Sequence, residues 1–386
     1  MCLFVLVSIS VGIAQIATTS NPPLFNKSER INKFKANFKN LTELEYIRQG
    51  LQTLRNRQNQ QRSEQTISID DIKYMEDRKI LEETYDKNTY SNLKYKSIQE
   101  ANKGLEEYLF EGDILLSPQE IDEMLNPRKK RQAMATKSRW NKTQPIPYFF
   151  DSNVNAGTRT LFRQAATFWS DNTCLNFKES IATPHIRIIT DVADIYGSPC
   201  YARTIDGTNV LSLGDSCAYF NTFTHEIAHT LGFWHEQSRH DRDNFITVIQ
   251  ENMNPLFVGN SIKQTPLTNN NYGQPYDWGS VMHYPGKGDD GKFVFIAKDK
   301  IYQSTMGSQH QPSFKDLYVM NQYYNCMCAT GAICQNGGFQ HPKNCNICIC
   351  PSGFGGAVCN QRQTAENGAI DTGAVLTVGF SLIILI

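Results

Sequence analysis

Apolar residues recur at helical spacing in two parts of the middle of the chain. Between residues 158 and 170 they fall three or four positions apart, which predicts an amphipathic helix with one face in a core. The side chains expected to point inward are Leu161, Phe162, Ala165, Phe168 and Trp169. A second helix is predicted by the same spacing in Phe220, Phe223, Ile227 and Leu231. It should end at Gly232, because glycine readily adopts the left-handed conformation that closes many helices.

Runs of β-branched and aromatic residues predict three strands ahead of the second helix. They lie at residues 146–150, 186–190 and 210–213. Together with the first helix they indicate a mixed sheet backed by a helix, in a domain of the α+β class. Strand signals become sparse after residue 235, until an amphipathic segment at residues 313–324.

Length and charge set this domain within a longer chain. At 386 residues the chain exceeds one average domain, so two or three units are expected. The 38 basic and 38 acidic side chains cancel, and no nucleic-acid partner is expected. An apolar run at residues 3–13 predicts a signal peptide cut near Ala14, so that residues 1–14 would be removed. The alternative is a buried N-terminal strand.

The cysteines support export. The chain has eleven, and removal of Cys2 with the signal peptide would leave an even number. Such cysteine usage is typical of disulfide-bonded proteins in an oxidising compartment, so we expect a secreted, extracellular protein. Asn26, Asn40 and Asn141 each begin an Asn-x-Ser/Thr sequence and are candidate glycosylation sites there.

Residues 15–131 differ in composition from the rest of the chain. They are polar, contain no cysteine and end in the basic run Arg128-Lys129-Lys130-Arg131. This run predicts cleavage after Arg131 by a furin-like protease, which would make residues 15–131 a pro-peptide; a solvated charge cluster is the alternative. Within the segment, Asp113 follows Gly112 and offers a carboxylate that is an acceptable zinc ligand. Taken alone, however, a Gly-Asp pair is an ordinary turn.

The strongest chemical signal is the sequence HEIAHTLGFWHE, which begins at His225. His225 and His229 are four residues apart and therefore share one helix face. A turn at Gly232 can bring His235 back as a third ligand, and three neutral imidazoles with one open position are typical of a catalytic zinc site. Glu226 would face the open position and take a proton from the zinc-bound water. Chance helical spacing explains a bare His-Glu-x-x-His, but it does not explain the extended pattern.

The C-terminal part is rich in cysteine. Six cysteines lie between residues 328 and 359 in a unit too short to bury a large core, which predicts a module held by disulfides. The close spacing of Cys345, Cys348 and Cys350 leaves a second zinc site as the alternative. The apolar end, residues 373–386, is shorter than the roughly 20 residues that span a bilayer. A lipid-anchor signal and a truncated end both stay open, and membrane attachment through this tail is not the expected outcome.

These motifs resemble the astacin family of zinc metallopeptidases, within the metzincins. The resemblance rests on HEIAHTLGFWHEQSRHDRD, which begins at His225, and on SVMHY at residues 280–284. FEGDI at residues 110–114 is similar to the aspartate switch of the family, and the six-cysteine unit is similar to the EGF-like module of nematode-type members. The resemblance implies a metzincin fold of two subdomains with a mixed sheet and an active-site helix, followed by that small module.

The resemblance also implies residue roles. The implied zinc ligands are His225, His229 and His235, with Tyr284 in the resting enzyme and Asp113 in the zymogen. Glu226 would be the general base, and Tyr284 would hydrogen-bond the developing oxyanion. Met282 would lie beneath the imidazoles, and Glu236 would meet the N-terminus that pro-peptide removal creates. The implied disulfides are Cys174–Cys326, Cys200–Cys217, Cys328–Cys345, Cys334–Cys348 and Cys350–Cys359.

The resulting expectation is a secreted, zymogen-type zinc metalloendopeptidase that binds one Zn²⁺ per subunit and cleaves extracellular proteins. Its expected units are a signal peptide, a pro-peptide, a peptidase domain, an EGF-like module and a tail, at residues 1–14, 15–131, 132–326, 327–360 and 361–386. The alternative is a catalytically silent matrix or adhesion protein that acts through its EGF-like module. Loss of Glu226 or of a histidine ligand would favour that alternative, and the sequence retains all of them.

Overall fold

The structure is a computed structural model that describes most, but not all, of the chain. The described residues are 26–38, 40–60, 67–84, 97–126, 139–191, 198–203, 208–253, 262–266, 268–308, 310–364, 374–378 and 381–385. The predicted signal peptide and the predicted processing site at Arg131 lie outside these ranges. Inside them, none of the helices has the length and hydropathy required to cross a lipid bilayer.

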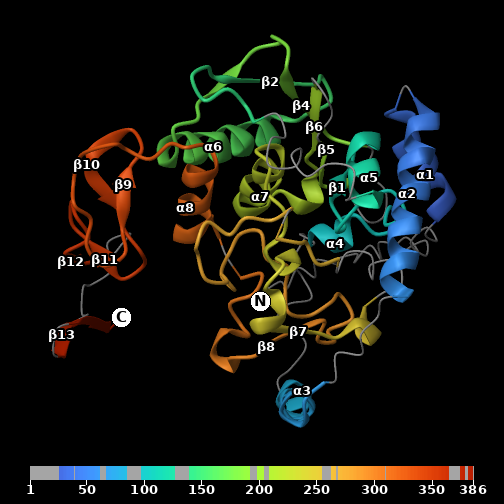
Figure 1. The fold of residues 1–386 in the computed structure, drawn as a ribbon. Helices are drawn as coiled ribbons and strands as arrows, with labels where there is room; N and C mark the ends of the chain where they lie inside the picture. Colours follow the sequence, from blue (N-terminus) through green and yellow to red (C-terminus); the bar gives the residue numbers. More distant parts are fainter. Residues whose placement is uncertain are drawn as a thin grey trace, which may run out of the picture.

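A six-stranded sheet occupies the top of the molecule in Figure 1, in the order β1-β5-β6-β4-β2-β3. The strands are β1 (Ile114–Leu115), β2 (Ile146–Phe150), β3 (Phe177–Glu179), β4 (His185–Ile189), β5 (Tyr201–Arg203) and β6 (Thr208–Ser212). Only β5 and β6 pair antiparallel; the other neighbours are parallel. The predicted strands correspond to β2, β4 and β6, whereas the shorter β1, β3 and β5 were not predicted.

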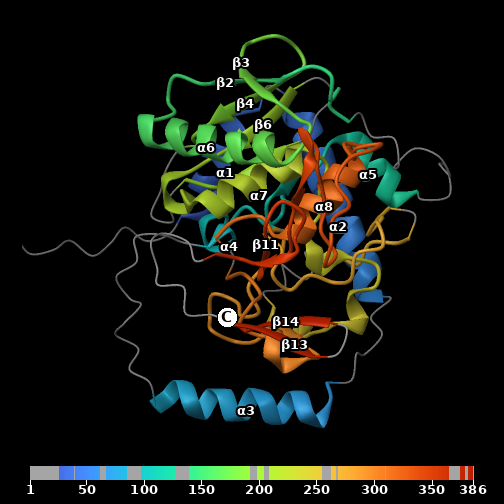
Figure 2. The same ribbon diagram turned by 90° about the vertical axis from the view of Figure 1, so that its left-hand side faces the viewer.

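Two helices, α6 (Ala156–Asn172) and α7 (Phe220–Thr230), pack together beneath this sheet (Figures 1 and 2). Trp169 of α6 is fully buried, and its indole N–H donates to the carbonyl of Thr224 at 3.0 Å. This bond fixes α7, which carries the first two histidines of the motif, against α6. The predicted inward face is buried at Phe162, Ala165 and Trp169, whereas Leu161 and Phe168 are only partly buried.

The second half of the predicted peptidase domain has little regular structure. It contains an antiparallel pair, β7 (Ile246–Val248) and β8 (Phe295–Ala297), and the helix α8 (Phe314–Tyr323). Short 3₁₀ helices in the region after β6 lie at Asp215–Cys217, Glu236–Ser238, Arg242–Asn244, Gln250–Asn252 and Lys300–Tyr302. Asp316 closes a capping box with Ser313 at the start of α8. Its carboxylate also accepts hydrogen bonds from Ser280 and from the backbone of Val281, which ties the 280–284 loop to α8.

The predicted pro-peptide region contains α1 (Lys27–Ala36), α2 (Leu41–Gln60), α3 (Ile69–Thr84), α4 (Ile98–Ala101) and α5 (Pro118–Leu125). Side chains from α1, α2, α5 and residues 105–116 share one apolar cluster with Tyr201 of β5. These helices therefore pack against the β1 edge of the sheet. By contrast, α3 lies apart from them, at the opposite end of the molecule beside β7 and β8 (Figures 1 and 2).

The C-terminal module consists of two short hairpins. Its strands are β9 (Phe339–His341), β10 (Asn344–Ile349), β11 (Phe354–Gly355) and β12 (Gln361–Arg362). Phe339 is buried against α8, with ring centroids 5.3 Å from those of Phe314 and Tyr318. The tail beyond the module contains an antiparallel pair, β13 (Ala374–Val378) and β14 (Ser381–Leu385).

The structure forms five disulfides in the described residues. They are Cys174–Cys326, Cys200–Cys217, Cys328–Cys345, Cys334–Cys348 and Cys350–Cys359, the same pairs that the resemblance implied. The sulfurs of Cys345, Cys348 and Cys350 are thus used in separate bonds, which argues against a second zinc site there. The three sequon asparagines, Asn26, Asn40 and Asn141, are exposed. Each side-chain oxygen accepts a hydrogen bond from a nearby backbone N–H.

Candidate metal centre

The three histidines of the motif converge on one buried point. His225 and His229 lie one turn apart on α7, and Gly232 then reverses the chain with a φ of 103°. This left-handed conformation is easily adopted by glycine, and a Cβ at the position would lie 2.8 Å from the hydroxyl of Tyr323. After the turn, His235 comes back beside the other two imidazoles, and all three are 3% exposed or less.

Hydrogen bonds orient all three rings in the same way. The Nδ1 atom of His225 lies 2.7 Å from the carbonyl oxygen of Val281, and that of His229 lies 2.8 Å from the carbonyl oxygen of Phe233. The Nδ1 atom of His235 lies 2.7 Å from a carboxylate oxygen of Glu111. Each Nδ1 therefore carries the proton and donates it, which leaves each Nε2 lone pair directed at the centre.

Asp113 of the predicted pro-peptide region inserts its carboxylate between the Nε2 atoms. Its Oδ2 lies 3.2 Å from Nε2 of His225 and 3.1 Å from Nε2 of His235, and its Oδ1 lies 3.5 Å from Nε2 of His229. Asp113 is fully buried. Burial alone would raise the pKa of this carboxyl, but the surrounding imidazoles outweigh that effect and hold the pKa well below its usual value.

The four side chains fit a zinc ion. Nε2 of His225 lies 3.0 Å from that of His229 and 3.2 Å from that of His235, and the four ligand atoms all fall within 4.8 Å of one another. Ligands about 2.0–2.1 Å from a tetrahedral zinc lie roughly 3.3 Å apart, close to these spacings. Oδ1 of Asp113 is also buried without a hydrogen-bond partner, which is costly for a carboxylate unless a cation neutralises it.

Glu226 lies next to the cluster on α7 and is also fully buried. Neither of its carboxylate oxygens has a hydrogen-bond partner among the residues that the structure describes. Burial, together with the nearby charge of Asp113, raises the pKa of Glu226 well above its usual value. A buried carboxyl with a strongly shifted pKa beside a metal cluster is the kind of group that transfers protons in an active site.

Tyr284 and Met282 reach the cluster from the 280–284 loop. The Tyr284 hydroxyl lies 2.7 Å from Oδ2 of Asp113 and 2.7 Å from the carbonyl oxygen of Glu111, and it can donate to one of them at a time. Met282 is buried, and its carbonyl accepts the backbone N–H of Glu236 at 3.0 Å. The loop therefore fixes the chain next to His235 through this backbone hydrogen bond.

Glu236, directly after the third histidine, points away from the cluster. Its carboxylate pairs with Arg239 at 3.0 Å and accepts the backbone N–H of Asp277 at 2.7 Å. Burial raises the pKa of Glu236 to about 8 in spite of the opposing charge of Arg239. Glu236 and Arg139, the first described residue after the predicted processing site, both line a cavity of 540 Å³.

Glu111 is the one residue of the cluster that the sequence analysis did not single out. Its side chain is fully buried and contacts Nδ1 of His235, and its own backbone has a φ of 53°. The tight turn from Phe110 to Ile114, closed by backbone hydrogen bonds of 2.7 and 3.0 Å, directs Glu111 and Asp113 to the same side. The only sequence signal that could have identified Glu111 is the FEGDI motif, in which Glu111 directly precedes Gly112.

The strand after Asp113 occupies an edge of the sheet. β1 pairs parallel with β5, with Ile114 opposite Ala202 and Leu115 opposite Arg203. The backbone N–H of Ala202 also donates to the carbonyl of Asp113 at 2.9 Å. The segment from Phe110 to Leu115 therefore covers both the cluster and the strand edge that borders it.

Comparisons with known proteins agree with these motifs. Residues 132–325, half of the chain, match the family model described as Astacin, a peptidase family. The chain is 38% identical over 291 residues to zinc metalloproteinase nas-31 of Caenorhabditis elegans, covering 69% of this chain and 46% of that protein. It is 39% identical over 270 residues to zinc metalloproteinase nas-32 of the same organism, with coverages of 67% and 40%.

A similar structure comes from a fish enzyme. High choriolytic enzyme 1, a hatching enzyme zinc-protease from Oryzias latipes, is 27% identical with a TM-score of 0.43 and is matched over 49% of this chain and 93% of that chain. The chain spans only about half the length of the two nematode relatives above. The family match itself covers the sheet from β2 onward, both helices beneath it, the three histidines and the 280–284 loop. This chain therefore belongs to the astacin family of peptidases.

Proposed function

We propose that this chain is a secreted zinc metalloendopeptidase made as an inactive precursor, which cleaves extracellular proteins once residues 15–131 are removed. The observation that carries the proposal is the position of Asp113 among three buried Nε2 atoms, at the place where a substrate would have to bind. A carboxylate there both completes the ligand set and excludes substrate. The same side chain would therefore both stabilise the precursor and keep it inactive.

The metal would be held by His225, His229 and His235, joined by Asp113 in the precursor and by Tyr284 in the mature enzyme. When bound, zinc would supply a water molecule of lowered pKa and polarise the scissile carbonyl. The protein orients the rings: the backbone carbonyls of Val281 and Phe233 and, in the precursor, the carboxylate of Glu111 accept the Nδ1 protons and hold the rings in place.

Glu226 would act as the general base and then as the acid. Its carboxyl is buried beside the cluster, and neither oxygen has a hydrogen-bond partner in the described part of the chain, so it is available to take a proton from the attacking water and pass it to the leaving amine. Tyr284 would exchange its bond to Asp113 for a bond to the substrate carbonyl oxygen, on which negative charge develops. Met282 would form the apolar floor beneath the histidines.

Substrate would bind as an extended strand along β5. Removal of the pro-peptide would uncover the backbone groups that β1 now uses, including the N–H of Ala202. Strand addition at such an edge supplies main-chain hydrogen bonds without demanding a particular sequence. The new N-terminus near Gln132 would reach Glu236 through the cavity that also contains Arg139.

Secretion, glycosylation at the three asparagines and cleavage by a furin-like protease complete the proposal. They are supported by the disulfides, by the exposure of Asn26, Asn40 and Asn141, and by the basic run that ends at Arg131. The six-cysteine module, which we propose to be EGF-like, packs on α8 through Phe339. A silent adhesion protein remains the second candidate, and it is favoured only by this module.

The test is to express the chain with its signal peptide and to measure bound zinc and casein cleavage before and after cutting at Arg131. We expect zinc in both states and cleavage only after the cut. Zinc without cleavage by the cut, folded chain would overturn the peptidase proposal and favour the adhesion protein. Cleavage by the uncut chain at the same rate would overturn the precursor proposal alone.

A further inference from the structure

The antiparallel pair β7–β8 has two different faces. Register pairs Ile246 with Ala297 and Val248 with Phe295, and these four side chains belong to the apolar cluster that also contains Tyr284. Between them, Thr247 lies opposite Ile296. Because side chains alternate along a strand, Thr247 and Ile296 point to the other face. We call this the outer face.

Helix α3 of the pro-peptide region covers the outer face. Ile67, Tyr74 and Met75 pack against a small cluster formed by Ile249, Phe293 and Ile296. The rings of Tyr74 and Phe293 lie 5.9 Å apart, and Ile296 is fully buried. The outer face is therefore an apolar surface that is shielded from water by a segment outside the peptidase domain.

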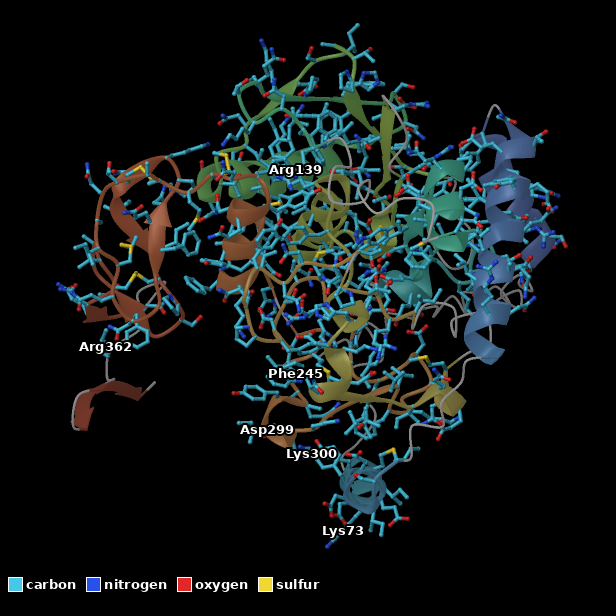
Figure 3. The ribbon with its side chains drawn as sticks, viewed as in Figure 1. Lys73, Arg139, Phe245, Asp299, Lys300 and Arg362 are labelled. Carbon is cyan, nitrogen blue, oxygen red and sulfur yellow. A yellow bond between two sulfur atoms is a disulfide. The ribbon has the colours of Figure 1, made fainter. Side chains whose placement is uncertain are left out.

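A charged pair anchors the same contact. Asp71, on the inner side of α3 and 5% exposed, forms a salt bridge with Lys300 and accepts the hydroxyl of Thr247 at 3.2 Å. The ammonium of Lys300 also lies 5.4 Å from the ring centre of Tyr74. Figure 3 shows Lys300 between the β8 region and α3, whereas Lys73 points away from the rest of the protein. Asp70, the neighbour of Asp71, is exposed.

The position of α3 separates this contact from the metal centre. The helices α1, α2 and α5 lie against the sheet, whereas α3 lies below β7 and β8 at the far end of the molecule (Figures 1 and 2). The predicted pro-peptide region thus contacts both halves of the peptidase domain. Cutting after Arg131 would break the covalent link but would leave both contacts in place.

We propose that the outer face, formed by Thr247, Ile249, Phe293, Ile296 and Lys300, is a second binding site of the peptidase domain, for an amphipathic helix that carries an inward carboxylate. Its occupant is α3. Before cleavage at Arg131, α3 is covalently linked to the peptidase domain; after cleavage it stays bound there without that link. The inference rests on the proposed cleavage at Arg131. It adds that activation has two steps, cleavage and then release of α3, and that release leaves an apolar site with one cation open on the mature enzyme.

The experiment uses the full chain, cut at Arg131, with a chelator present so that the metal no longer ties Asp113 to the histidines. The measured quantity is the rate at which a tagged pro-peptide leaves the immobilised peptidase domain. Asp71→Asn and Lys300→Ala should each speed release by roughly tenfold, because each removes one charge of a pair whose carboxylate is buried and whose ammonium is partly buried. The matched controls, Asp70→Asn and Lys298→Ala, alter exposed neighbours and should release at the parent rate.

Two further measurements keep the result interpretable. The double reversal Asp71→Lys with Lys300→Asp should bring release back toward the parent rate, which a merely misfolded variant would not do. Equal release rates for the parent, both test variants and both controls would overturn the site. Casein cleavage by the same samples after zinc is restored tests the proposed function separately: if cleavage fails while the release rates separate as expected, the site stands and the peptidase proposal falls.

Discussion

Two of the contacts between the predicted pro-peptide region and the peptidase domain differ in chemistry. At the metal centre it contributes Asp113 and Glu111, two buried carboxylates that each retain one oxygen without a hydrogen-bond partner. On the outer face of β7–β8 it contributes a helix whose single inward carboxylate, on Asp71, is paired with Lys300 and surrounded by apolar side chains.

The difference indicates which contact depends on a bound metal ion. Carboxylates buried among histidines are stable only with a cation or protons to balance them, so the contact at the metal centre should follow the metal. The α3 contact already contains its own cation and apolar cluster, so it should be indifferent to the metal. The predictions below separate the two contacts, from the largest expected effect to the smallest.

Asp113→Ala should have the largest effect. In the uncut chain it removes the ligand that competes with substrate, and casein cleavage by the uncut chain should rise by about 100-fold or more, because a charged group in a buried cluster is lost. Asp70→Ala, which alters an exposed pro-peptide carboxylate, is the matched control and should leave the uncut chain inactive. An uncut Asp113→Ala chain as inactive as the parent, with the cut chain active, would show that Asp113 is not the block.

Glu111→Gln should weaken the same contact less. The change removes the charge that now accepts the Nδ1 proton of His235 but keeps the shape of the turn, so activity of the uncut chain should rise by roughly tenfold. The comparison is with Glu123→Gln on α5, which lies away from the histidines. If both uncut variants are equally inactive, the charge of Glu111 does not contribute to the block.

Tyr74 tests the outer face without touching a charge. Tyr74→Ala should speed release of the cut pro-peptide from chelated enzyme by about threefold to tenfold, through loss of ring packing against Phe293. Tyr74→Phe should release no faster than the parent, because the Tyr74 hydroxyl is buried and has no hydrogen-bond partner among the described residues. Faster release by Tyr74→Phe would mean that the hydroxyl, not the ring, makes the contact.

The smallest predicted effect is an absence of change with pH. Burial would raise the pKa of Asp71, but Lys300 and other hydrogen-bond donors outweigh it and lower the pKa below the ordinary value of 3.8. A lowered carboxyl pKa stabilises the contact above the ordinary value and loses that effect as pH falls through the lowered one. In chelated enzyme, release should therefore vary less than about twofold between about pH 8 and pH 5, and should accelerate only below about pH 4. Faster release already near pH 6 would point to a histidine instead.

Local sequence patterns predicted the scaffold of the site well. The helices α6 and α7, the strands β2, β4 and β6, and the turn at Gly232 follow from periodicity and from one glycine, because each depends on neighbours within a few residues. The strands β1, β3 and β5 are only two or three residues long and exist through pairing with distant segments. No periodicity can be read from so short a run.

Side-chain partners far apart in sequence were harder to predict. His225, His229 and His235 share one motif, and their convergence was foreseeable; Glu111 joins them only because its backbone takes a φ of 53° beside Gly112. Asp71 and Lys300 are 229 positions apart, and each is an ordinary charged residue in its local sequence. The outer face could therefore be recognised only once the fold brought α3 onto β7–β8.

The most direct test of the account compares Glu226→Ala with the parent, both cut at Arg131, with zinc content and casein cleavage measured on the same samples. The account predicts equal zinc in the two proteins and a loss of cleavage of about 10²- to 10⁴-fold in the variant, because the histidines bind the metal and Glu226 moves the proton. Cleavage by the variant at a rate close to that of the parent would contradict the role of Glu226. Absence of zinc from the folded parent would contradict the metal centre itself.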